Sequence, residues 1–364
     1  MRWINCPSHR GDSVKNLLQK HFEQPNRRVL LLGGAGFDPR AQVFPLELNR
    51  LLQHRLKALL LKEERPKTTD DLISRANDVN ALLTNELNDL SVVPIEILSR
   101  DLSLVGGRRA VSRVAQELSN HWTDIVVDVS ALSTGISFPI IRCTMEWADQ
   151  NPSNNQLHIV LAEHSIVDQK ISSEPLDRSK EIFGFKGNYG LESTSKAAKL
   201  WLPQLAIDQR EALNRIYDEI RPHDVCPILP FPSRDPRAGD RLLEHFANEI
   251  LNIWEVTPRN VIYAAEGNPL DLYRTVLRID DERKVVFREA DGSQLLLTPT
   301  GSKALALGAV MAAIERNLPV RYVESIAYNV NWDEIEKAHE SEVDLLHLWL
   351  AGEPYLNNNE SNTD

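Results

Sequence analysis

A short apolar run that leads into glycines and a helix start, residues 28–40, constrains the fold of this chain most strongly. Its four apolar residues, 29–32, predict a buried strand, and the following glycines let the backbone turn sharply and approach a ligand closely. Asp38 and Pro39 fit an N-cap and a first helical residue. Open α/β proteins build anion sites from this order of elements, but a capped turn without a ligand fits the same residues.

Length and charge limit the classes of protein that this chain can belong to. The 364 residues suffice for two domains, and 42% hydrophobic with 26% charged residues is typical of soluble globular proteins. A net charge of −11 argues against duplex nucleic acid as a partner. Small anionic ligands remain compatible, because a pocket can be basic on an acidic protein.

Cysteine usage and hydropathy indicate a cytoplasmic protein. Cys6, Cys143 and Cys226 are widely spaced and odd in number, which fits neither a disulfide framework nor a zinc site. No apolar run reaches the roughly 20 residues of a membrane helix. The polar N-terminus does not fit a signal peptide, so we expect a cytoplasmic location without a membrane partner.

Strands that alternate with helical patterns predict an α/β fold with parallel sheets. The predicted strands of the first half are 28–32, 58–61, 92–98, 124–130 and 157–161. Helical spacing of apolar residues separates them, and 201–220 is also predicted to be helical.

The order of features then repeats, which predicts two Rossmann-like halves related by internal duplication. Residues 224–237 repeat the apolar run and the Asp-Pro-Arg of 28–40, and 295–303 match 125–135. The predicted domains are a lead-in, a first half, a linker with a helix, a second half, and an acidic helix with a disordered tail: 1–27, 28–168, 169–222, 223–330 and 331–364.

Two turns carry candidate ligand-binding groups. Hydroxyls, a glycine and Lys303 in 298–303 can hold a phosphate at a helix N-terminus, although a capped turn with a solvent-facing lysine explains them too. Ser133 and Thr134 are the counterparts in the first half. Asp128, at the end of the preceding predicted strand, suits either a ligand contact or a cap of the turn.

The sequence offers no sign of a catalytic or metal centre. A Gly-x-Ser-x-Gly elbow is missing, and the ten histidines form no close pair with ligand spacing. We therefore predict no catalytic residue and no metal ligand, and no cofactor can be identified.

Residues 298–309 and 318–323 resemble the sensory Rossmann-like domains of CRISPR-associated and related defence proteins. The duplicated layout is similar to the fused pair of such domains in cyclic-nucleotide sensors of bacterial anti-phage systems. The resemblance implies binding of cyclic oligonucleotides or other nucleotide signals between two halves. The implied ligand-facing positions are Gly34, Gly36, Ser133, Thr134, Thr300, Gly301, Ser302 and Lys303. No effector domain such as a nuclease is recognisable, which implies a separate partner protein.

We therefore expect a nucleotide-binding sensor or regulatory subunit that acts through a partner, in prokaryotic antiviral defence. Alternatives are a nucleotide- or phosphosugar-handling hydrolase or transferase, with Asp38 or Asp128 as base or metal ligand, and a ligand-free assembly subunit; homo-oligomers are compatible with each. Because the repeat keeps Asp-Pro-Arg but not the glycines, we expect the ligand-binding residues of the opening stretch to lie within 33–37. The predicted binding residues are Gly33, Gly34, Gly36, Phe37, Asp128, Ser133, Thr134, Thr300, Gly301, Ser302 and Lys303.

Overall fold

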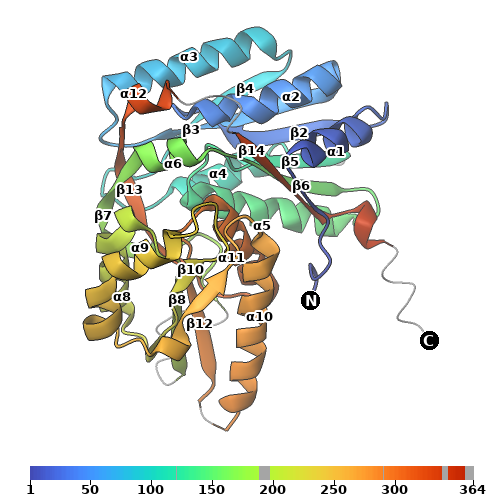
Figure 1. Ribbon diagram of the computed structural model, residues 1–364. Helices are drawn as coiled ribbons and strands as arrows, with labels where there is room; N and C mark the ends of the chain where they lie inside the picture. The colour runs from blue at the N-terminus through green and yellow to red at the C-terminus, as the bar shows by residue number, and fades with distance from the viewer. Residues whose placement is uncertain (120, 188–196, 290, 338–342, 357–364) are drawn as a thin grey trace, which may run out of the picture. The chain divides into compact units, whose positions relative to one another are not determined.

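The computed structural model describes the chain except for residues 120, 188–196, 290, 338–342 and 357–364 (Figure 1). The chain forms two compact units. The seven-stranded unit comprises Asn5–Ser172 and Ile326–Asp364, and the smaller unit comprises Met1–Ile4 and Ser173–Ser325. Both are α/β, as the alternating pattern predicts.

The first unit is built on a seven-stranded sheet with the order β1-β14-β6-β5-β2-β3-β4. Its five strands from β6 to β4 are parallel. The strands are β1 (Ser8–Arg10), β2 (Val29–Gly34), β3 (Leu56–Glu64), β4 (Leu90–Glu96), β5 (Asp124–Asp128), β6 (Gln156–Glu163) and β14 (Asp344–Ala351).

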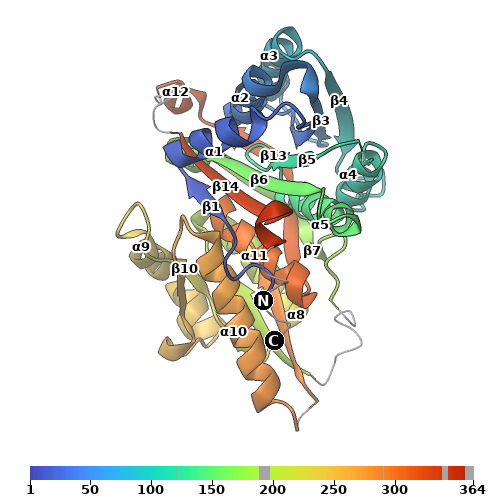
Figure 2. The ribbon, with the colours of Figure 1, turned by 90° about the vertical axis from the view of Figure 1, so that its right-hand side faces the viewer.

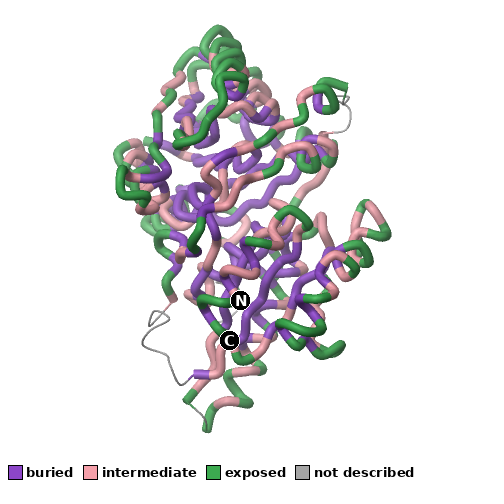
Figure 3. Tube along the Cα trace, turned by 90° about the vertical axis from the view of Figure 1, so that its left-hand side faces the viewer, coloured by how far each residue is buried: buried purple, intermediate pink, exposed green. Residues whose placement is uncertain are grey.

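Helices cover both faces of this sheet, so its central strands are buried on both sides. All residues of β2, β5 and β6 are buried, which explains their nearly continuous apolar runs (Figure 3). One face carries α1 (Asp12–Phe22), α2 (Val43–Leu52) and α3 (Asp70–Glu86), and the other carries α4 (Gly106–Ala115) and α5 (Thr134–Gln150) (Figure 1). The short helices α6 (Ser165–Lys170) and α12 (Trp332–Ile335) pack on each other.

Two antiparallel strands extend the sheet beyond β6, and both were missed. The expected lead-in 1–27 contains β1 and α1. Among its described residues, the expected acidic helix of 331–364 contains the short α12 and then β14. Strand β14 pairs with β6 on one side and with β1 on the other (Figure 2). Its apolar run 345–351 is a buried-strand pattern that the acidic residues before it obscured. The predicted disordered tail, 357–364, lies outside the described residues.

The strands of the smaller unit form one three-stranded and two two-stranded sheets. Its strands are β8 (Ala198–Pro203), β9 (Asp224–Val225), β10 (Ile228–Pro230), β11 (Ile262–Ala264) and β12 (Ser293–Thr298), together with most of β7 (Ile171–Glu181) and the first half of β13 (Arg321–Val330). Strand β8 lies between β12 and β9, and β10 continues β9 and pairs with β11. A parallel bridge from Leu297 to Val320 adds the start of β13 beside β12.

The helices of the smaller unit are α8 (Arg210–Ile220), α9 (Ala238–His245), α10 (Pro269–Val286) and α11 (Lys303–Arg316). Helix α11 packs on α10, and its small residues are buried from Ala304 to Ala313. Gly308 permits this contact, since a Cβ there would lie 2.3 Å from the carbonyl oxygen of Pro269. Short 3-10 or π turns occur at Pro39–Gln42, Gln53–Arg55, Ile207–Gln209, Glu249–Ile253, Pro258–Asn260 and Glu353–Tyr355.

Both units have the same order of parallel strands. Numbered along the chain, the five strands lie in the order 5-4-1-2-3, as β6-β5-β2-β3-β4 in one unit and β13-β12-β8-β9/β10-β11 in the other. This is the Rossmann-like order read from the opposite edge. The Rossmann-like α/β prediction is therefore confirmed, while internal duplication stays a prediction.

The strand order corrects how the repeat was aligned. The Asp-Pro-Arg of 235–237 follows β10, the second strand of its unit, whereas that of 38–40 follows β2, a first strand. The true first strand is β8, which lies within the predicted linker 169–222 and overlaps the predicted helix 201–220. That helix is wrong for 201–203, because Trp201 and Leu202 pair with Leu296 and Leu297 of β12. The match between 125–135 and 295–303 is correct in this respect, because β5 and β12 are each the fourth parallel strand of their unit.

No helix within the described ranges combines the length and the apolar character needed to cross a bilayer.

Gly34 and Gly36 are expected to respond differently to alanine. A Cβ at Gly34 would lie 2.7 Å from the carbonyl oxygen of Ala131, whereas one at Gly36 would have no heavy atom of the described chain within 4 Å. Gly34→Ala should destabilise the seven-stranded unit by about 1–3 kcal/mol, because backbone must move. Calorimetric melting of both variants checks this, and equal melting temperatures would contradict it.

Candidate functional site

Ligand crevices of Rossmann-like sheets form where strands 1 and 4 lie side by side and their connections leave in opposite directions. This position is the carboxyl end of β2 and β5 in one unit, and of β8 and β12 in the other. All the predicted binding residues lie at these ends. They divide between the units: Gly33, Gly34, Gly36, Phe37, Asp128, Ser133 and Thr134 in the first, and Thr300, Gly301, Ser302 and Lys303 in the second.

The glycines after β2 serve close packing within the fold. Gly33 and Gly34 are the last residues of β2, and both are buried. Gly34 faces the backbone of Ala131 in the turn after β5, and a Cβ at Gly33 would lie 3.2 Å from a methyl group of Leu60. Gly36 alone has open space where a Cβ would be. The need for glycine at 34 thus has a packing explanation.

A buried ion-pair network follows these glycines. Asp38 caps the turn that begins at Pro39 and accepts three hydrogen bonds from the Arg40 guanidinium, of 2.7, 2.9 and 3.2 Å. Arg40 also pairs with Asp168 at 2.6 Å, and it is 4% exposed. Burial alone would lower the pKa of Arg40, but the carboxylates of Asp38 and Asp168 outweigh it and raise that pKa.

Phe37 belongs to a group of aromatic side chains at the same end of the sheet. Its ring centroid lies 5.6 Å from that of Tyr328 and 6.1 Å from that of Trp332. Arg65 lies 5.0 Å above the Tyr328 ring, and Arg75 lies 4.8 Å above the Trp332 ring. Phe37 is therefore packed against the end of β13 and the start of α12.

The turn after β5 is held by carboxylates of the chain itself. Asp128 Oδ1 accepts hydrogen bonds from the backbone N–H and the hydroxyl of Ser130. At the start of α5, the N–H of Ser133 donates to Glu63 Oε1 at 2.8 Å, and Glu63 pairs with Arg65 at 2.6 Å. Glu63 thus occupies the position where the sequence predicts a ligand anion. The hydroxyl oxygen of Ser133 is buried without a hydrogen-bond partner among the described residues.

The turn after β12 leaves a buried polar atom without a partner. Thr298 accepts from the indole of Trp201 at 2.9 Å, Thr300 donates to the carbonyl of Gln204, and Ser302 caps α11 by accepting from Leu305 N. The Gln204 side chain donates to the carbonyl of Leu305 at 3.2 Å. Its Oε1 has no partner in the described part of the chain, although Gln204 is 1% exposed.

Gln204 lies directly against this turn. A Cβ on Gly301 would be 2.9 Å from Gln204 Oε1, so the absence of a side chain at 301 leaves room for the amide. Gln204 was missed because β8 was read as part of a helix, and Glu63 was missed because a charged strand end is typical of solvent exposure. Two features of the sequence could have revealed this contact. They are Gly301 in the turn and a glutamine, Gln204, directly after an apolar run.

The side chains with metal-ligand chemistry lie elsewhere in the seven-stranded unit. His21, Asp124 and His158 offer ligand atoms that all lie within 4.8 Å of one another. Asp124 is the first residue of β5, at the end of the sheet opposite to the predicted anion site. The absence of metal ligands stays a prediction. It was drawn from close spacing along the sequence, and the members of this group are 103 and 34 residues apart.

Comparisons with known proteins give only distant similarity. The chain matches no protein-family model and no curated protein. Among solved structures, it is similar to a glycopeptide N-methyltransferase, MtfA, complexed with sinefungin, at 15% identity and a TM-score of 0.22 over 48% of this chain. The match spans 62% of that chain. A putative universal stress protein from Pseudomonas aeruginosa UCBPP-PA14 is similar at 12% identity, TM-score 0.22, over 84% of this chain and 95% of its own.

Removal of Arg40 should destabilise the seven-stranded unit strongly. Arg40→Met leaves Asp38 buried without its cation, and we expect a loss of about 3–5 kcal/mol. Arg50→Met is the control, because Arg50 is 66% exposed and its ion pair with Glu47 is worth at most about 1 kcal/mol. Calorimetry of the unit's melting transition measures both. Adding Asp38→Asn to Arg40→Met should recover part of the loss, and no recovery would exclude the unpaired carboxylate as its cause.

Proposed function

We propose that this chain is a nucleotide-binding sensor or regulatory subunit whose ligand binds at the turn after β12 in the smaller unit. The observation that carries the proposal is the amide oxygen of Gln204, which lies beside the N-terminus of α11 and has no partner among the described residues.

The start of α11 supplies groups that suit a phosphate. The helix is 14 residues long, and its first N–H groups and macrodipole favour negative charge at this end. Lys303 is its first residue, and Thr300 and Ser302 add hydroxyls to the same turn. A phosphate group at this turn would receive backbone N–H donors and a nearby positive charge.

Gln204 adds a requirement for a hydrogen-bond donor on the ligand, which inorganic phosphate meets poorly. Its Oε1 can only accept a hydrogen bond, and a buried acceptor without a donor costs about 1–3 kcal/mol. A ligand with a hydroxyl or amino donor near its phosphate would satisfy this oxygen. Nucleotides carry both features, through the ribose hydroxyls, the base amino groups and the phosphate.

The seven-stranded unit is the weaker candidate for the same ligand. The carboxylate of Glu63 already accepts the N–H at the start of α5, and Arg65 neutralises it. A ligand phosphate would have to displace this pair. The smaller unit needs no such displacement at Thr300 and Ser302, whose hydroxyl bonds are made to the backbone.

Binding without turnover is favoured over catalysis. The enzyme alternative requires Asp38 or Asp128 as a base or metal ligand. Both oxygens of Asp38 are bonded to Arg40, and Asp128 Oδ1 is bonded to Ser130. Action through a partner, and a role in prokaryotic antiviral defence, follow only from the resemblance to defence sensors.

A thermal-shift screen tests the proposal. We expect the melting temperature to rise with one member of a panel of mononucleotides, cyclic dinucleotides and cyclic oligonucleotides, with chromatography showing the ligand unchanged. The double variant Ser302→Ala, Lys303→Ala should bind it at least about tenfold more weakly, since each charge-assisted hydrogen bond contributes roughly 1.5–3 kcal/mol.

Lys284→Ala is the matched control, because Lys284 is a 54% exposed lysine on another helix of the same unit. It should bind as the unaltered chain does. Gln204→Met should weaken the binding of the nucleotide but not the binding of inorganic phosphate. No shift with any nucleotide would refute the proposal, and consumption of the ligand would favour the enzyme alternative.

A further inference from the structure

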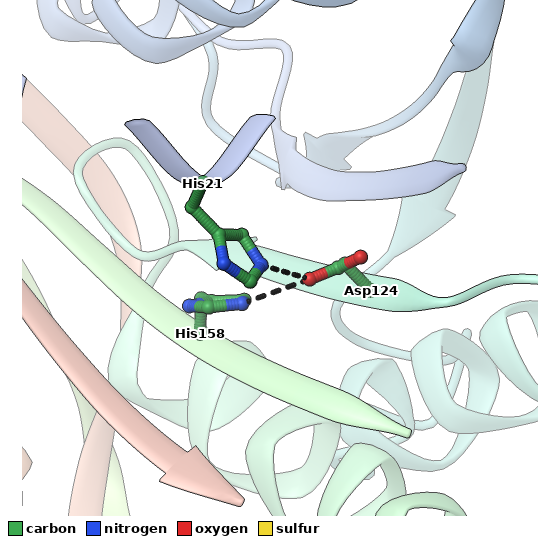
Figure 4. A group of neighbouring side chains, drawn as sticks. All are labelled: His21, Asp124 and His158. Atoms are coloured by element: carbon green, nitrogen blue, oxygen red, sulfur yellow. Dashed lines mark hydrogen bonds and ion pairs between the residues drawn. The ribbon is translucent and has the colours of Figure 1, made fainter. Parts of the chain in front are cut away.

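We propose that His21, Asp124 and His158 form a binding site for a divalent transition-metal ion of the zinc type. The three side chains come from α1, β5 and β6 and converge on one point of the seven-stranded unit (Figure 4). The site is separate from the nucleotide site proposed above, and neither depends on the other.

The donor set and its spacing suit such an ion. Two imidazole nitrogens and one carboxylate oxygen are ligands that zinc accepts. His21 Nε2 lies 2.7 Å from Asp124 Oδ1, and His158 Nε2 lies 3.1 Å from the same oxygen. Two ligand atoms at about 2.0–2.1 Å from a tetrahedral ion are roughly 3.3 Å apart. The two histidine nitrogens lie within 4.8 Å of each other. Side-chain shifts that bring them closer would let the three groups surround an ion, with a water molecule as the fourth ligand.

Neighbouring side chains hold the ligands as outer-shell groups hold them in metal sites. His158 Nδ1 lies 2.9 Å from His347 Nε2, so a metal on Nε2 of His158 leaves Nδ1–H to donate to His347. His347 Nδ1 in turn lies 3.3 Å from His9 Nδ1. The other oxygen of Asp124 accepts from the Thr123 hydroxyl at 2.6 Å.

Burial and charge also favour a cation. Asp124 is 0%, His158 1% and His21 5% exposed, in surroundings that include Phe22 and Trp349. Burial lowers the pKa of His158, and hydrogen bonds from both histidines hold the pKa of Asp124 low despite its burial. A metal ion binds through the unprotonated nitrogen of an imidazole and the ionised oxygen of a carboxylate.

Arg27, which pairs with Asp124, leaves room for more positive charge. Arg27 lies 3.8 Å from Asp124 Oδ2, but it also pairs with Glu353 at 2.5 Å. Arg27 together with these two carboxylates carries a net charge of −1. An ion among His21, Asp124 and His158 would compensate this charge and fasten α1 to the middle of the sheet.

Metal analysis of the full chain tests the proposal. The chain is purified with a tag that contains no histidine, and mass spectrometry measures its metal content. We expect about one ion per chain, and a lower melting temperature after chelation. Refolding with Co²⁺ should give visible ligand-field absorption.

Variants then identify the ligands. His21→Gln should lose the ion, and His347→Gln should weaken its affinity by about 10–100-fold, as outer-shell changes do. His54→Gln is the control, because His54 is exposed and lies outside the cluster. If His21→Gln does not fold, the proposal is tested on the unaltered chain alone, by its Co²⁺ absorption and by the change in its melting temperature after chelation.

Two results would overturn the proposal. One is an unaltered chain that is isolated without metal and gives no Co²⁺ absorption after refolding. The other is an ion that remains bound with unchanged affinity in both His21→Gln and His347→Gln. The cluster would then be a buried hydrogen-bond network alone.

Discussion

The parallel pairing of β2 with β5 is the contact on which the seven-stranded unit depends. Val29 to Leu32 pair with Asp124 to Val127, and every residue of both strands is buried. After the paired residues, the segments that follow β2 and β5 turn toward opposite faces of the sheet. Gly34 nevertheless lies against the backbone of Ala131. Close packing at this point fixes the turns that carry Asp38 and Asp128, and it explains why a glycine is needed there without any ligand.

Two sheets with one strand order have different chemistry at equivalent turns. In the seven-stranded unit, the start of α5 is bonded to Glu63, so negative charge at the helix N-terminus comes from the chain itself. In the smaller unit, the equivalent turn is bonded through Thr300 to the backbone of Gln204. Among the described residues, both the Gln204 side-chain oxygen and the Ser133 hydroxyl of the first unit are buried without a partner. Equivalent turns of one strand order therefore differ in the side chains that fill them.

The alternation of strands and helices in the sequence was sufficient to predict the Rossmann-like class, because buried parallel strands are continuous apolar runs. It failed where a strand is flanked by strongly polar or helix-forming residues, as at β8 and β14. For the candidate site, the sequence indicated Thr300 to Lys303 through their turn chemistry. Gln204, Glu63 and His158 could not be found in this way, since each acquires its neighbours only through sheet pairing between distant segments.

The histidine and aspartate cluster illustrates why such neighbours escape local patterns. His9, His347, His158 and Asp124 lie on β1, β14, β6 and β5, four adjacent strands of one sheet. The pairing of His9 with His347 exists only because β14 returns from the far end of the sequence to lie between β1 and β6. Side chains on one face of neighbouring strands come within bonding distance whatever their separation along the chain. The antiparallel strands β14 and β1 thus add His347 and His9 to Asp124 and His158, which the parallel strands β5 and β6 already bring together.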